Sequence, residues 1–162
     1  MRNPRALLIP IVLLVVVASL AALSGGRKQA PRPAPALPAE VLQGPRVTLA
    51  SLRGHRALIN FWASWCGPCR KEAPELAQAQ NKLGRRAEIV GVDWGDNAGN
   101  ARRFIRTHGW RYPIVRDATN EVGTRYGIAG LPTTFVLDPR GRIVAKLIGP
   151  QSATALVRAA LG

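Results

Sequence analysis

The segment Phe61-Trp62-Ala63-Ser64-Trp65-Cys66-Gly67-Pro68-Cys69 decides the fold of this 162-residue chain. It ends in two cysteines separated by two residues, and these are the only cysteines of the sequence. Residues 57–62 are almost continuously apolar, as in a strand that is covered on both faces of a sheet. Apolar residues then recur on one helical face up to Leu83, and Gly84 supplies a stop, which predicts a helix over residues 67–83. The cysteine pair is therefore expected at a strand-to-helix turn.

The rest of the chain alternates between strand and helix patterns. The predicted elements are strands at 46–52, 57–62, 88–92 and 114–115, helices at 67–83, 98–108 and 120–126, a strand hairpin at 133–137 and 143–148, and a helix at 152–161. This order predicts an α/β fold with a mixed central sheet, parallel in its first half and antiparallel in its second, flanked by helices.

The N-terminal part of the sequence differs in composition from the rest. Residues 7–23 carry no charge, and this length is close to the minimum of about 17 residues for a membrane-spanning helix. We expect residues 1–24 to be a retained signal-anchor, a single transmembrane helix, although Ser19-Leu20-Ala21 leaves signal-peptidase cleavage open. Residues 25–45 contain five prolines and predict a Pro-rich linker. The folded domain is then predicted to span residues 46–162.

The chain is strongly basic, with 23 Lys and Arg against 9 Asp and Glu and a net charge of +14. Such a balance is also found in proteins that bind nucleic acids or anionic membranes. The basic residues are scattered, and no strip of aromatic and basic residues predicts a platform for stacking bases. We therefore predict a solvated basic surface near anionic lipid headgroups and no nucleic-acid partner.

The predicted position of the two cysteines favours redox chemistry. Cys66 would lie at the N-terminus of a helix, where the helix dipole and the free N–H groups stabilise a thiolate. Cys69 would follow one turn later on the same side, close enough to attack a mixed disulfide on Cys66. Pro68 fits the first turn of the helix because the missing N–H is not needed there.

The sequence supports other uses of the two cysteines less well. A disulfide across two residues closes a very small loop and restricts the unfolded chain little. A zinc site needs about four ligands, whereas this chain offers two cysteines, so no metal site is predicted and no cofactor beyond the redox-active Cys66–Cys69 disulfide. Binding of Cu(I) needs fewer soft ligands and stays open. His108 lies on an apolar helix face and is predicted to be packed rather than catalytic.

Residues 60–74, together with Gly130-Leu131-Pro132-Thr133 downstream, closely resemble the thioredoxin superfamily. More narrowly they resemble its membrane-anchored bacterial TlpA/ResA/CcmG (DsbE) type, and the likeness runs from about Val47 to the C-terminus. The resemblance implies a thioredoxin fold with a helix-bearing insert, here around residues 94–113. It also implies a domain that faces the periplasm or the cell exterior and exchanges thiols with protein disulfides.

The resemblance also assigns site residues. Cys66 matches the attacking cysteine of the family, and Cys69 matches the resolving one. Pro132 matches the cis-proline that faces the cysteine pair and leaves the backbone of Leu131 free to pair with a substrate peptide. Together with Trp65, which directly precedes Cys66, Leu131 and Pro132 are the predicted substrate-binding residues.

Glu72 matches an acidic residue of the extracytoplasmic reductases. One turn beyond Cys69, it could accept or relay a proton of that thiol if burial raises its pKa toward neutrality. Pairing of a surface Glu72 with Arg70 or Lys71 is an equally open alternative. Asn60 stands where cytoplasmic thioredoxins have a buried Asp, which fits the extracytoplasmic branch.

The sequence therefore predicts a membrane-tethered thiol-disulfide oxidoreductase that reduces protein disulfides and receives electrons from a membrane-embedded thiol relay. Residues 91–94 are similar to the CcmG branch and point to cytochrome c maturation, but Thr133 stands where that branch has an acidic residue. A disulfide-introducing oxidase of the same fold and a Cu(I)-binding delivery or sensing module are the alternatives.

Overall fold

The computed structural model describes residues 30–162, whose strands form one sheet of seven strands in the order β1-β7-β6-β3-β4-β5-β2. The strands are β1 (Arg32–Pro33), β2 (Glu40–Gln43), β3 (Arg56–Trp62), β4 (Ala87–Trp94), β5 (Ile114–Asp117), β6 (Thr133–Leu137) and β7 (Arg142–Ile148). The helices are α2 (Gly67–Leu83), α3 (Ala98–Thr107), α4 (Glu121–Tyr126) and α5 (Ala153–Leu161).

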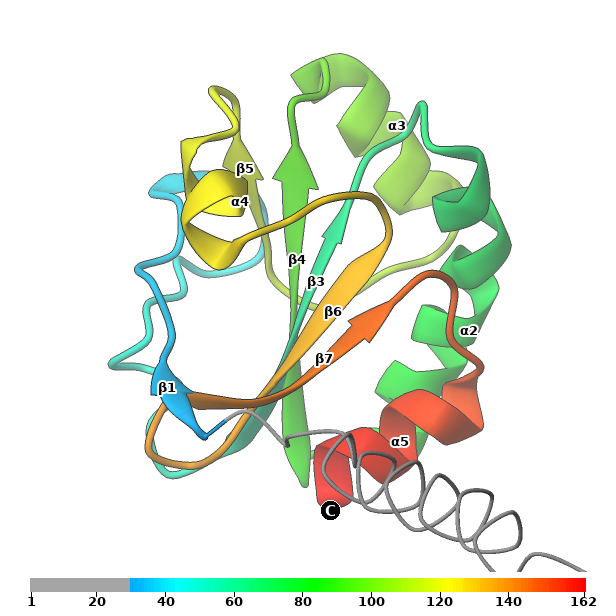
Figure 1. The fold of residues 1–162 in the computed structure, drawn as a ribbon. Helices are drawn as coiled ribbons and strands as arrows, with labels where there is room; N and C mark the ends of the chain where they lie inside the picture. Colours follow the sequence, from blue (N-terminus) through cyan, green and yellow to red (C-terminus); the bar gives the residue numbers. More distant parts are fainter. Residues whose placement is uncertain (1–29) are drawn as a thin grey trace, which may run out of the picture. The chain divides into compact units, whose positions relative to one another are not determined.

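Strand β3 is the middle of the sheet, parallel to β4 on one side and antiparallel to β6 on the other. Its side chains alternate between two apolar clusters, with Leu58 and Trp62 in one and Ile59 and Phe61 in the other. Figure 1 shows α2, α3 and α5 on one face of the sheet and α4 on the opposite face. The predicted mixed sheet flanked by helices is confirmed.

The prediction of a linker over residues 25–45 is wrong for the part that the structure describes, because β1 and β2 lie within it. Prolines exclude a central strand but are tolerated at a sheet edge, and β1 pairs only with β7 while β2 pairs only with β5. Leu42 is buried in the same apolar cluster as residues of α2 and α3. The folded unit therefore begins at Pro31 and not at residue 46.

The strand predicted over residues 46–52 is absent from the structure. Thr48 and Ser51 instead hydrogen-bond to each other's backbone, with Ser51 Oγ accepting from the Thr48 N–H at 3.0 Å and Thr48 Oγ1 accepting from the Ser51 N–H at 3.2 Å. Such side-chain hydrogen bonds compete with strand pairing and close a turn. The remaining predicted helices and strands are observed within a few residues of their expected bounds.

The predicted anchor over residues 1–24 and the start of the predicted linker lie outside the described residues. Between residues 30 and 162, none of the helices combines the length and the apolar character that crossing a membrane requires.

Leu42→Ala tests whether the proline-rich segment belongs to the fold. Because Leu42 is 6% exposed, the substitution should lower the free energy of unfolding by about 2 to 4 kcal/mol in urea titrations of the oxidised protein. Val144→Ala is the matched control, since Val144 is 39% exposed, and should change stability by less than about 0.5 kcal/mol. If Leu42→Ala changed the free energy of unfolding as little as Val144→Ala does, residues 31–45 would be a spacer and not part of the fold.

Candidate active site

The two cysteines lie at the N-terminus of α2, directly after the central strand. Cys66 is the N-cap residue, and its Sγ accepts a hydrogen bond from the Cys69 N–H at 3.1 Å. The two Sγ atoms form a disulfide, with the Cα atoms 5.2 Å apart. Both residues are buried, at 4% and 1% exposure, so a substrate can reach the pair only over a small area.

In the loop between β3 and α2, both backbone polar groups of Ser64 are hydrogen-bonded to side chains. The Ser64 N–H donates to Asp96 Oδ2 at 2.6 Å, and Arg70 donates to the Ser64 carbonyl oxygen at 2.8 Å. The next residue, Trp65, is 57% exposed although most large apolar side chains of the described chain are buried. The loop therefore presents an indole ring to solvent directly beside Cys66.

The peptide bond between Leu131 and Pro132 is cis and directly precedes β6. Thr133 is the register partner of Phe61, so Pro132 reaches the same end of the sheet at which the Cys66 loop begins. Leu131 is half-buried and packs against both apolar clusters. The structure thus brings this pair to the cysteine end of the sheet, while its substrate-binding role stays a prediction.

Glu72 is a buried residue of α2 with 1% exposure. Its Oε2 accepts from Asn60 Nδ2 and its Oε1 accepts from the Gln151 N–H, both at 3.0 Å. Burial raises its pKa to about 7, although both hydrogen bonds act in the opposite direction. The alternative of a surface Glu72 paired with Arg70 or Lys71 is therefore wrong.

Asn60 connects Glu72 to the sheet. Its Nδ2 donates both to Glu72 and, at 2.8 Å, to Thr134 Oγ1 on β6. A single amide thus links the helix that carries the cysteines to two neighbouring strands. An ionised Asp at this position would have no donor to offer to the Glu72 carboxylate, whereas the Asn60 amide supplies one.

Asp93 is a buried acidic residue that sequence reasoning did not select. It is the register partner of Trp62 at the end of β4 and is fully buried, and within residues 30–162 neither of its carboxylate oxygens has a hydrogen-bond partner. Arg116 Nε lies 3.7 Å from Asp93 Oδ2, which is too far for a hydrogen bond. Burial and the charge of Asp96 raise the pKa of Asp93 to about 8, whereas Arg116 lowers it. An acidic residue directly after an apolar strand was the only sequence signal.

His108 has the packed position expected for it. Its ring lies 4.3 Å from the ring of Phe104, centroid to centroid, and burial lowers its pKa. The ring therefore serves as packed aromatic surface at the end of α3.

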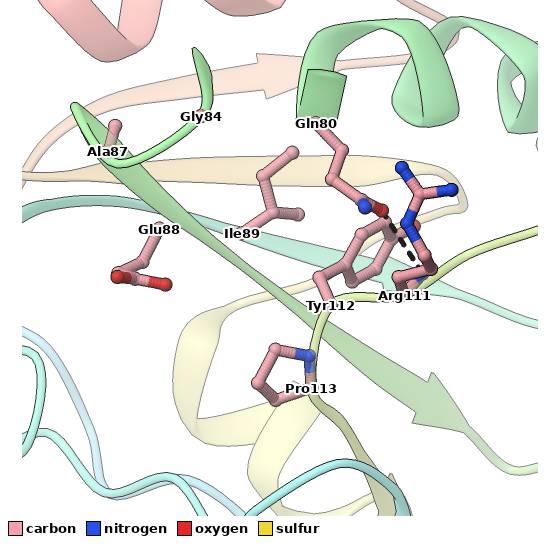
Figure 2. A pocket seen from close by; sticks show the side chains of 8 residues that line it. All are labelled: Gln80, Gly84, Ala87, Glu88, Ile89, Arg111, Tyr112 and Pro113. Atoms are coloured by element: carbon pink, nitrogen blue, oxygen red, sulfur yellow. Dashed lines mark hydrogen bonds between the residues drawn. The ribbon is translucent and has the colours of Figure 1, made fainter. Parts of the chain in front are cut away.

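A cavity of about 200 Å³ lies at the opposite end of the sheet from the cysteines. Figure 2 shows Gln80, Tyr112 and Arg111 on one side of it, with the Arg111 N–H donating to Gln80 Oε1 at 3.1 Å. Ala87, the first residue of β4, also lines it, whereas Cys66 follows the last residues of β3. This cavity is therefore separate from the candidate active site.

Comparison with known proteins places the chain in a family. Residues 31–146 match the model described as the AhpC/TSA family. The chain belongs to the AhpC/TSA family. The match begins at the same residue as the folded unit, which supports the corrected boundary of the domain.

Two relatives of this chain carry names that refer to thiol chemistry. The chain is 35% identical over 117 residues to thiol-disulfide oxidoreductase ResA of Bacillus subtilis, and 43% identical over 105 residues to thiol:disulfide interchange protein HelX of Rhodobacter capsulatus. These segments are 72% and 64% of this chain, but only 65% and 58% of the two relatives, so less than two thirds of each.

A solved structure is similar over most of its length. The thiol:disulfide interchange protein of the thioredoxin family from Chlorobium tepidum is 34% identical, with a TM-score of 0.70 over 82% of this chain and 98% of that one. The resemblance to the ResA and CcmG type of the thioredoxin superfamily is confirmed, and so is the thioredoxin-like fold.

Asp93→Asn tests the buried carboxyl group at the end of β4. The pKa of Asp93 is raised from 3.8 to about 8, so its contribution to stability is fully present below pH 3.8 and is lost as the pH rises through 8. The variant should lack this loss and gain stability over the wild type between pH 4 and pH 8, on the order of 1.4 kcal/mol per pH unit.

Denaturant titrations of the oxidised protein at several pH values check this prediction. Glu88→Gln is the control, because it removes an exposed carboxylate from the same strand and should leave the pH dependence of the wild type intact. A wild-type protein and an Asp93→Asn variant with parallel stability curves would contradict the raised pKa.

Proposed function

We propose that this AhpC/TSA-family protein is a thiol-disulfide oxidoreductase that reduces disulfides of other proteins. The observation that carries the proposal is the Cys66–Cys69 disulfide at the N-terminus of α2, at the same end of the sheet as the cis Leu131–Pro132 bond. The names of ResA, HelX and the Chlorobium protein support it. The active form in this direction is the dithiol.

In the first step the Cys66 thiolate attacks one sulfur of a substrate disulfide. A bond forms between Cys66 Sγ and that sulfur, the substrate S–S bond breaks, and the second substrate sulfur leaves as a thiolate. The Cys69 N–H donates to Cys66 Sγ, and Cys66 stands as the N-cap at the positive end of the α2 dipole. This N–H and the helix dipole stabilise the negative charge that the nucleophile carries.

In the second step Cys69 resolves the mixed disulfide. The Glu72 carboxylate, one turn further along α2, takes the proton of the Cys69 thiol. The resulting thiolate attacks Cys66 Sγ, the Cys66–Cys69 bond forms, and the remaining substrate sulfur leaves as a thiolate. Two electrons have then passed to the substrate. A pKa of about 7 allows Glu72 to accept and release this proton at neutral pH.

Three residues around the cysteines are proposed to bind the substrate polypeptide. The exposed ring of Trp65 offers apolar surface next to Cys66. The backbone of Leu131, directly before the cis-proline Pro132, pairs with the substrate chain in the manner of an added strand. These contacts would hold the substrate disulfide over the small exposed area of the pair.

The proposed setting is the outer side of the cytoplasmic membrane. The uncharged residues 7–23 would anchor the chain, and a membrane-embedded thiol relay would return the Cys66–Cys69 disulfide to the dithiol form. The likeness of residues 91–94 to the CcmG type favours cytochrome c precursors as physiological substrates.

Single cysteine variants test this function. Cys66→Ser should abolish reduction of insulin disulfides, because the nucleophile at the N-cap of α2 is lost and the remaining Cys69 is only 1% exposed. Cys69→Ser should retain the first step and accumulate a mixed disulfide with the substrate, which mass spectrometry detects and dithiothreitol releases. Persistent reduction of insulin by Cys66→Ser would overturn the mechanism, and tight Cu(I) binding without any turnover of disulfides would favour the copper alternative.

A further inference from the structure

A cavity of about 290 Å³ lies between the Cys66 loop and α3. Ser64 and Arg70 contribute one wall, and Arg103, Phe104 and His108 of the α3 segment contribute the other. Ser64 is separated from Cys66 only by the exposed Trp65. The cavity therefore borders the loop that carries Cys66, on the α3 side of that loop.

The cavity is positively charged. Its lining contains Arg70 and Arg103 and no carboxylate, and α3 itself contains three arginines and no acidic residue. Neither Arg70 nor Arg103 takes part in any of the ion pairs found within residues 30–162. The nearby carboxylate of Asp96 is occupied by the N–H groups of Ser64 and Asn97. The two guanidinium groups thus have charge available for a ligand.

Besides the two arginines, the cavity is lined by the aromatic rings of Phe104 and His108 and by the polar side chains of Ser64, Asn100 and Thr107. Arg70 is held in place by its hydrogen bond to the Ser64 carbonyl oxygen at 2.8 Å. The Phe104 ring stacks on the buried Trp62 with the ring centroids 4.9 Å apart, and its centroid lies 4.3 Å from that of the tilted His108 ring, so Phe104 is held by the core. Burial lowers the pKa of His108, so its ring contributes aromatic surface and little charge. A carboxylate at the end of a short aliphatic chain fits such a lining.

The cavity and the cis-proline lie on different sides of the cysteine pair. In the sheet, β3 has β6 on one side and β4 on the other. Strand β6 follows Pro132, whereas β4 leads into α3. A substrate chain that pairs with Leu131 and places its cysteine over Cys66 can therefore continue across Trp65 toward the cavity. The two contacts would bind the same polypeptide on either side of its reacting cysteine.

We propose that the cavity lined by Arg70 and Arg103 is a second substrate subsite, which binds an Asp or Glu side chain close in sequence to the reacting cysteine of the substrate. The subsite rests on the proposed reductase function and adds a substrate class to it, namely disulfide proteins with an acidic residue beside the target cysteine. It would act through charge complementarity, as electrostatic contacts around an interface select partners.

Three synthetic peptide disulfides that differ at one position test the subsite. They carry Glu, Gln or Lys two residues from the cysteine, and the reduced full-length protein in detergent reacts with each while tryptophan fluorescence is followed by stopped flow. The second-order rate constant should be about fivefold higher for the Glu peptide than for the Gln peptide at low salt. Arg103→Glu should reverse the order and favour the Lys peptide.

Arg106→Glu is the matched control. It makes the same charge change on the same helix, but Arg106 lines a different cavity with Leu42, so the preference for the Glu peptide should persist. Equal rates for all three peptides would overturn the subsite and leave the reductase function standing. An equal loss of preference in both variants would also overturn it, because the preference would then come from overall charge. Failure to reduce any peptide would overturn the function itself.

If Arg70 and Arg103 bound anionic lipid headgroups instead of a substrate peptide, the Arg103→Glu variant would give a different result. Arg103→Glu would then weaken binding to phosphatidylglycerol vesicles while the wild type showed no preference among the peptides. That combination would overturn the peptide subsite.

Discussion

The buried carboxyl group of Glu72 is the contact on which the arrangement around the cysteines depends. It joins α2, which carries both cysteines, to β3 through Asn60 and to the segment before α5 through the N–H of Gln151. Glu75, one turn further along α2, adds a hydrogen bond from the Ala153 N–H at 2.7 Å. The helix that presents Cys66 is thus fixed to the sheet and to α5 by carboxylates. Burial of Glu72 also raises the pKa of its carboxyl group to about 7, so the group can bind and release a proton at neutral pH.

Glu72 is accompanied by a second buried carboxyl group at this end of the sheet. Asp93 pairs in register with Trp62, and its pKa of about 8 has the same main cause, loss of hydration, as the pKa of about 7 of Glu72. The surroundings of the two groups differ. Each carboxylate oxygen of Glu72 accepts a hydrogen bond, whereas among the described residues Asp93 has only Arg116 as a partner, at 3.7 Å. Glu72 is therefore suited to hold a defined position, and Asp93 mainly makes stability depend on pH.

The central part of the fold could be predicted from the sequence because its signals are local. The apolar run of β3, the cysteine pair and the start of α2 follow one another along the chain, and their order determines the strand-to-helix turn. The edge strands could not be predicted in this way. β1 and β2 are strands only because β7 and β5, far along the sequence, offer them free edges. The burial of Glu72 likewise depends on Gln151, which is 79 residues away.

The pH titration of the Glu72 carboxyl carbon by NMR tests the central claim most directly. The oxidised protein, labelled with ¹³C at the glutamate carboxyl groups, gives the resonance, and its absence from the spectrum of Glu72→Gln assigns it. The burial seen in the structure predicts a midpoint near pH 7. A midpoint near the ordinary value of 4.5 would contradict both the buried position of Glu72 and its proposed exchange of a proton with Cys69.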